Sequence, residues 1–138
     1  MKHANTCRTT ITNQALFTTS PHHPQQQHLA TADSGASNIY VAKQDMQMLT
    51  NTTPDAPTNI THVQAAEGTI MKSHATGDIV FKGMPNVTFK AQVFEDLQST
   101  LLGVGAIIDK ADVKAILSTD GIEFVNRSGD IVLAGPRC

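Results

Sequence analysis

The sequence contains no tryptophan, one tyrosine and two cysteines, and only 16% of its 138 residues are charged. Cys7 and Cys138 lie near opposite ends with no evident base beside them, so we expect free thiols without a catalytic role. The longest apolar stretch, residues 101–108, is far shorter than the roughly 18 residues that a membrane-spanning helix needs. The N-terminus also lacks the apolar run of a secretory signal. We therefore expect a cytoplasmic protein with no membrane contact.

The chain also has no large excess of either charge, since it has ten Lys and Arg and twelve Asp and Glu, and its formal net charge is −2. Phosphate binding needs several clustered cations. Because the chain has no basic run, we expect this domain to bind no nucleic acid.

Residues 1–28 contain no acid, four of the six histidines and little apolar mass. We expect a disordered polar leader, because so few apolar side chains cannot offset the entropy of ordering the segment. Its histidines, His3, His22, His23 and His28, have no fixed spacing and no rigid support, so we expect no metal site.

Residues 29–138 are predicted to form one all-β domain, because Val, Ile and Thr dominate short runs separated by Gly, Asn, Asp or Pro. Glycine-containing turns at residues 67–68, 119–121 and 126–129 predict local hairpins. Short helices are predicted at Val104–Lys110 and Gln44–Leu49, and a surface loop at Thr50–Thr58. The expected strands are Leu29–Ala32, Asn38–Ala42, Ile60–Ala66, Thr69–His74, Asp78–Lys82, Val87–Phe94, Val113–Ser118, Ile122–Val125 and Asp130–Leu133.

Asp33-Ser34-Gly35-Ala36 is the one local sequence that asks for a chemical explanation. Alone, the motif is weak evidence for a functional site, since an acid followed by a hydroxyl and a glycine is a common turn. The context of the motif strengthens that evidence, because the motif ends one apolar segment and precedes another, Ile39-Tyr40-Val41. A Gly-turned hairpin, residues 60–74, comes next, and Leu101-Leu102-Gly103 follows it. This order favours a functional site over a simple turn.

With these segments the chain resembles the retropepsin-like aspartic proteases, and among them the protease domain of copia-type retrotransposon polyproteins. The resemblance rests on Asp33-Ser34-Gly35-Ala36, on Val63-Gln64-Ala65-Ala66-Glu67-Gly68 and on the stretch from Val93 to Gly105. Residues 118–124 and 129–133 look like the closing strands of that domain. The family implies an all-β closed barrel of short strands with a flap hairpin and one or two short helices, assembled as a homodimer.

The resemblance also implies roles for particular residues. Asp33, one from each subunit, would be catalytic and would activate a water that attacks peptide bonds of the element's own polyprotein. Ser34, Gly35 and Ala36 would complete the active-site loop, Ala65, Ala66, Glu67 and Gly68 would form the flap, and Leu101, Leu102 and Gly103 would form a second loop. No metal or organic cofactor is implied. The implied location is cytoplasmic, including the interior of virus-like particles.

Two alternatives stay open at this point. The first is a catalytically inactive, domesticated domain of the same fold that acts in protein binding. The second is a nucleic-acid or metal module that works through residues 1–28. A serine mechanism through Ser34 or Ser37 is weaker, because the sequence does not show the histidine and oxyanion arrangement that it requires. His62 and His74 are expected at surface positions of the hairpin.

Overall fold

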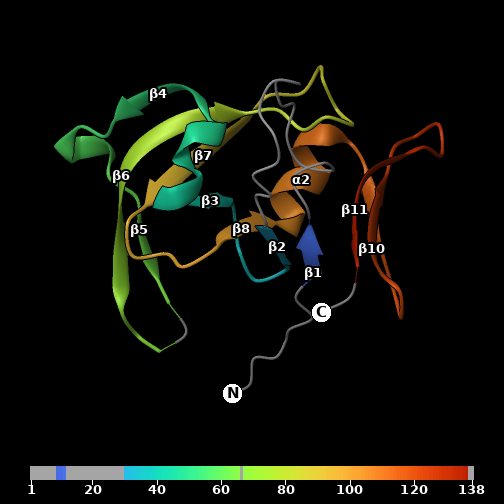
Figure 1. Ribbon diagram of the computed structural model, residues 1–138, viewed down its shortest axis with the longest axis horizontal. Coiled ribbons are helices and arrows are strands. Elements are labelled where there is room, and N and C mark those ends of the chain that lie inside the picture. The colour runs from blue at the N-terminus through green and yellow to red at the C-terminus, as the bar shows by residue number, and fades with distance from the viewer. Residues whose placement is uncertain (1–8, 12–29, 66, 137–138) are drawn as a thin grey trace.

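The computed structural model of the chain describes residues 9–11, 30–65 and 67–136, and strands account for most of its regular structure (Figure 1). The mostly β character expected from the sequence is therefore confirmed. The strands are β1 (Thr9–Ile11), β2 (Ala30–Asp33), β3 (Ile39–Ala42), β4 (Thr50–Pro54), β5 (His62–Gln64), β6 (Ile70–Ile79), β7 (Phe89–Phe94), β8 (Thr100–Gly103), β9 (Lys114–Ser118), β10 (Gly121–Val125) and β11 (Ile131–Pro136). The helices are the α-helix α2 (Val104–Ala111) and the 3₁₀ helices η1 (Lys43–Met48) and η2 (Pro57–Asn59). None of the described helices is long and apolar enough to cross a membrane.

The strands form two sheets. The larger sheet has the order β1-β2-β8-β3-β7-β6-β4, with β5 paired to β6, and the smaller sheet has the order β11-β10-β9. β8 runs parallel to β2 and antiparallel to β3, so it separates two strands that follow one another in the chain. The larger path has β1 and β4 at its two ends, and the last three strands pair through their own short turns in a separate sheet. The closed barrel that the family resemblance implies stays a prediction.

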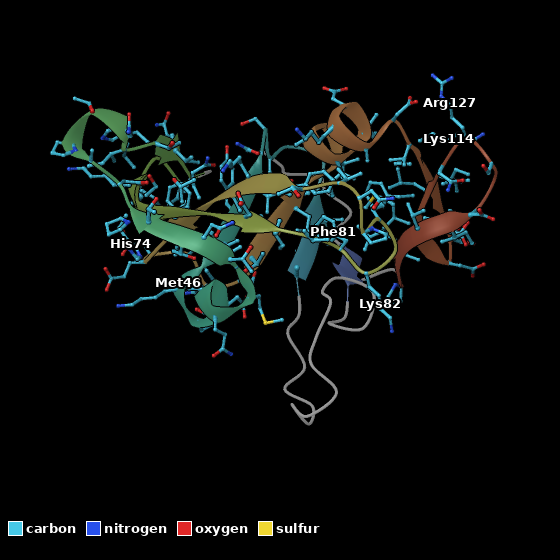
Figure 2. The ribbon with its side chains drawn as sticks, turned by 90° about the horizontal axis from the view of Figure 1, so that it is seen from above. Met46, His74, Phe81, Lys82, Lys114 and Arg127 are labelled. Carbon is cyan, nitrogen blue, oxygen red and sulfur yellow. The ribbon has the colours of Figure 1, made fainter. Side chains whose placement is uncertain are left out.

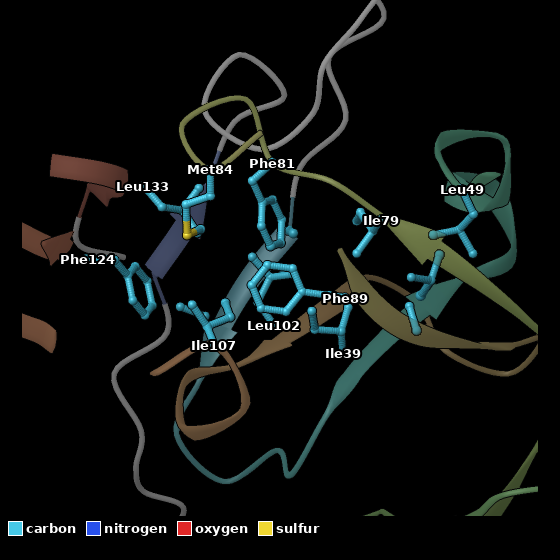
Figure 3. Close-up of a cluster of buried hydrophobic side chains, with 14 of the residues drawn as sticks. Ile39, Leu49, Ile79, Phe81, Met84, Phe89, Leu102, Ile107, Phe124 and Leu133 are labelled. Carbon is cyan, nitrogen blue, oxygen red and sulfur yellow. The ribbon is translucent and has the colours of Figure 1, made fainter. Parts of the chain in front are cut away.

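One hydrophobic core joins both sheets and α2 (Figure 3). Ile39 on β3, Leu102 on β8 and Ile107 on α2 are fully buried in it. Phe124 on β10 and Leu133 on β11 bring the small sheet into the same cluster. The small sheet is therefore held to the large one by apolar burial, which is the main favourable term in folding.

The three glycine-containing turns are found where the sequence predicts them. They join β5 to β6, β9 to β10 and β10 to β11. Gly68, Gly121 and Gly129 have φ angles of 97°, 144° and 89°, in the region that glycine adopts most readily. The prediction of local hairpins is therefore confirmed, and the predicted helix at 104–110 is confirmed as α2.

The predicted disordered leader contains one strand. Thr9–Ile11 lies inside that segment, but it forms β1 and pairs antiparallel with β2. The prediction is wrong for these three residues, because their backbone bonds to β2 supply order that local apolar content does not indicate. The other leader residues, 1–8 and 12–29, lie outside the described residues.

Two further segments differ from the prediction. Residues 50–58 were expected to be a loop, yet residues 50–54 form β4 and η2 begins at Pro57. β4 is a strand because it pairs with β6 through its backbone, while most of its side chains stay exposed. The strand predicted at 69–74 and the first two residues of the one predicted at 78–82 lie in one continuous strand, β6, which ends at Ile79, so residues 80–82 are not a strand. Gly77 does not break that strand; a Cβ at this position would lie 3.0 Å from the Cβ of Leu49, so the glycine marks close packing.

Two isoleucines of the small sheet test this packing. Ile122 is 2% exposed, whereas Ile116 on the neighbouring strand is 42% exposed. We expect Ile122→Ala to lower the free energy of unfolding by about 2–5 kcal/mol, because it removes buried methyl and methylene groups and leaves a cavity. Ile116→Ala should cost less than about 1 kcal/mol. Urea denaturation of both variants measures the difference, and equal losses would contradict this packing of the small sheet on the core.

Candidate active site

Asp33 is the last residue of β2, and it is half-buried. The chain turns immediately after it, since the backbone N–H of Ala36 donates to the carbonyl oxygen of Asp33 at 3.2 Å. The N–H of Gly35 donates to Oδ1 of Asp33 at 2.8 Å. The bond forms because Gly35 has no Cβ, so its backbone can approach the carboxylate closely. Ser34 and Gly35 are exposed and Ala36 is half-buried, so the loop faces outward.

Asn38 ties the end of this turn to two other strands. Its carbonyl oxygen accepts from the N–H of Gly103 on β8 at 3.0 Å. Its side-chain Nδ2 donates to Oε1 of Gln92 on β7 at 3.2 Å, and its Oδ1 accepts from the N–H of Ile39 at 3.0 Å. The sequence interpretation did not single out Asn38. The sequence signal that could have pointed to Asn38 is that asparagine often bonds to nearby backbone at the edge of a turn.

Leu101, Leu102 and Gly103, which the resemblance assigned to a second loop, belong instead to strand β8. They lie beside β2 in register, and Gly103 is paired with Asp33. A Cβ at Gly103 would lie 2.6 Å from the carbonyl oxygen of Asn38, closer than real Cβ atoms come to another heavy atom. Only glycine therefore fits where β8 passes the turn. The three residues support the Asp33 turn from the neighbouring strand.

A buried polar contact fixes the start of β8. Oγ1 of Thr100 donates to Oδ2 of Asp45 at 2.7 Å and accepts from the N–H of Ala42 at 3.0 Å. Asp45 is 7% exposed and Thr100 is 1% exposed. A buried carboxylate is costly unless it is hydrogen-bonded, so this contact has to form when the chain folds. It joins η1 and the end of β3 to the strand that supports Asp33.

The expected flap residues lie at the tip of the β5–β6 hairpin. The N–H of Ala65 donates to the carbonyl oxygen of Thr69 at 2.8 Å, and the N–H of Gly68 donates to that of Ala65 at 2.9 Å. Glu67 and Gly68 are exposed, and Ala66 lies outside the described residues. The hairpin tip and the turn after β2 both point toward the lower side of the molecule in Figure 1.

Across the part of the chain that the structure describes, no group of three or more His, Cys, Asp or Glu could hold a metal ion. No protein-family model and no curated protein matches the chain. The elements of the candidate site are a half-buried carboxylate at the end of a strand, a turn braced by two neighbouring strands, and a hairpin that points to the same side.

Gly103 and Gly105 give a matched test of this geometry. At Gly105, in the first turn of α2, a Cβ would meet nothing within 4 Å. We expect Gly103→Ala to lower the free energy of unfolding by at least about 1–3 kcal/mol, because a methyl group forces β8 away from the turn. Gly105→Ala should be neutral or stabilising by up to about 1 kcal/mol, since alanine is the better helix former. Thermal unfolding measures both, and a neutral Gly103→Ala would contradict the close approach.

Proposed function

We propose that the chain is an aspartic endopeptidase of the retropepsin kind, in which Asp33 from each of two subunits forms the catalytic pair. The observation that carries the proposal is the Asp33 turn. The carboxylate accepts from the Gly35 N–H at 2.8 Å, and the strand pair of Asp33 with Gly103 fixes where the turn begins. A catalytic group needs such a fixed position, because small errors of placement are costly in rate.

The β5–β6 hairpin supports the same proposal. It is a two-stranded element with an exposed tip, Glu67 and Gly68, and it points to the side of the molecule toward which the Asp33 turn also points. A hairpin of this kind is suited to close over an extended peptide and to exclude water from the reacting groups. We assign it as the flap of the proposed enzyme.

The proposed mechanism follows from the chemistry of paired carboxylates. Two carboxylates about 3 Å apart cannot both ionise, so the pair holds one proton. The ionised Asp33 activates a water that attacks the scissile carbonyl carbon, and the protonated Asp33 of the other subunit donates to the carbonyl oxygen as charge develops there. The Gly35 N–H holds the carboxylate in place. By the resemblance, Ser34 would bond across the two-fold axis and join the two loops.

Asp33→Asn is the decisive variant. The amide keeps the shape of the side chain, but it can neither share the proton nor activate water, so we expect turnover to be abolished while the fold is retained. Asp109→Asn is the matched control, because Asp109 is an exposed aspartate on α2 outside the site, and it should keep full activity. Cleavage of a peptide library, with and without a transition-state-mimicking aspartic-protease inhibitor, measures both.

The outcomes of that assay separate the proposed enzyme from its rivals. A wild-type chain that cleaves nothing in the library would favour the inactive binding domain. Cleavage that survives Asp33→Asn would exclude the carboxylate pair and require another catalytic group.

Activity should depend on association of two chains, because each chain supplies one Asp-Ser-Gly and hence half of the site. We expect specific activity to fall when the protein is diluted below the dimer dissociation constant. An excess of Asp33→Asn chain should lower the activity of wild type, because mixed dimers carry a single competent carboxylate. Activity and sedimentation measured over one dilution series test this. Undiminished activity in a monomeric sample would refute the shared site.

A further inference from the structure

A carboxylate lies at the base of the β5–β6 hairpin, where the hairpin leaves the larger sheet. Asp55 directly follows β4 and is half-buried. Its Oδ2 accepts from Oγ of Ser73 at 2.5 Å, and its Oδ1 accepts from Oγ1 of Thr76 at 2.7 Å. Its backbone N–H donates to the carbonyl oxygen of His74 at 2.9 Å. Asp55 therefore contacts three nearby residues of β6. One of them, Ser73, directly follows the residues of β6 that pair with β5.

Ser73 links the Asp55 carboxylate to Thr61, the residue directly before β5. Its Oγ accepts from the N–H of Thr61 at 2.8 Å, and its own N–H donates to the carbonyl oxygen of Thr61 at 2.9 Å. Ser73 is 2% exposed, so its hydroxyl depends on these protein partners. The chain of bonds runs from the Thr61 N–H through the Ser73 hydroxyl to the Asp55 carboxylate. It joins β6 and Thr61 to the end of β4.

The bonds of Asp55 lie on either side of a bulge. The β6–β7 register shifts between Ser73 and Ala75, so His74 is the extra residue. Figure 2 shows His74 on β6, at the opposite end of the molecule from Lys114 and Arg127. His74 is half-buried rather than at the surface as expected, and among the described residues its Nε2 is a buried atom without a hydrogen-bond partner. Such an atom costs free energy, and the bonds to Asp55 on both sides of the bulge oppose that cost.

We infer that Asp55 is a positioning residue for the β5–β6 hairpin, whose carboxylate sets how readily the hairpin opens. The reason is that a bulge bends a strand and ends regular pairing, so it is a natural place for a hinge. Below the bulge, Ala75 to Ile79 pairs with both β4 and β7 in the larger sheet. Above it, Ser73 still pairs with Phe94 on β7, and residues 70–72 pair with β5. A charged acceptor that binds Ser73 and Thr76 spans this boundary.

The effect on the reaction rests on the proposed function, in which the hairpin closes over the substrate. If only the closed hairpin binds peptide well, the apparent affinity falls in proportion to the closed fraction. Weakening the Asp55 contacts lowers that fraction in the free enzyme. The Michaelis constant should then rise by about the same factor, while kcat, measured on enzyme already closed over substrate, changes less.

The experiment compares Asp55→Asn with Asp78→Asn by native-state hydrogen exchange. Asp78 is a matched control, because it is also an aspartate with two side-chain donors, Asn51 Nδ2 at 3.0 Å and Lys90 Nζ at 2.8 Å, but it lies on the sheet side of the bulge. Those hydrogen bonds, Asn51 first and then Lys90, lower the pKa of Asp78. We expect Asp55→Asn to speed exchange of hairpin amides in residues 62–73 by about ten-fold or more, and to leave β3 and β7 unchanged.

Asp78→Asn should leave hairpin exchange unchanged. An unchanged hairpin in Asp55→Asn, or an equal rise over the whole sheet, would overturn the inference. If Asp55→Asn does not fold, Thr76→Val decides, because it removes only the donor to Oδ1 while keeping the shape. It should give a smaller rise confined to the hairpin, and no rise would overturn the inference.

Activity is the second readout, and it separates the two proposals. In an active enzyme, Asp55→Asn should raise KM several-fold with a smaller change in kcat, and Asp78→Asn should change neither. A loss confined to kcat would overturn the positioning role. A wild-type chain without protease activity would refute the proposed function, while the exchange experiment would still decide the role of Asp55.

Discussion

The geometry around Asp33 depends on the insertion of β8 between β2 and β3. These two strands follow one another in the chain, but both pair with β8, so the turn at residues 34–38 has to span two strand spacings, roughly 9–10 Å. A two-residue hairpin turn would instead have paired β2 with β3 directly. Leu102 is fully buried at the centre of this arrangement, and the N–H of Gly103 bonds to the turn. The carboxylate is therefore positioned by a segment far along the chain.

Features that depend on local chemistry could be predicted from the sequence. The turns at Gly68, Gly121 and Gly129 and the helix α2 were found because a few adjacent residues determine them. Strands β1 and β4 could not be found in this way. β4 is rich in threonine, ends at Pro54 and buries little, so it has no apolar alternation, and only the backbone of β6 makes it a strand.

The same division applies to the candidate site. The Asp33 turn follows from residue types within three positions, and the sequence predicts it, because an acid followed by a hydroxyl and a glycine is a common turn. Asn38, Asp45 and Asp55 were missed, because each is a common polar residue whose partners lie on other strands. Which polar groups meet is set by strand register and bulges, and a single sequence does not show where a register shifts. The long-range hydrogen bonds around the site therefore required the structure.

The proposed site combines a strand within the larger sheet with a hairpin that extends from that sheet. Asp33 sits on a strand inside the larger sheet, next to the core, whereas the β5–β6 hairpin extends from it with His62, Gln64, Ile70 and Lys72 exposed. A two-stranded hairpin is marginally stable in water by itself, so its persistence depends on how it is joined to the sheet. At that junction, Asp55 and Ser73 add a directional hydrogen bond to the continuous backbone of β6 and to the burial of Ala75. In the opening proposed for the hairpin, a few directional bonds can hold one orientation and still break singly, which a close-packed apolar junction would resist.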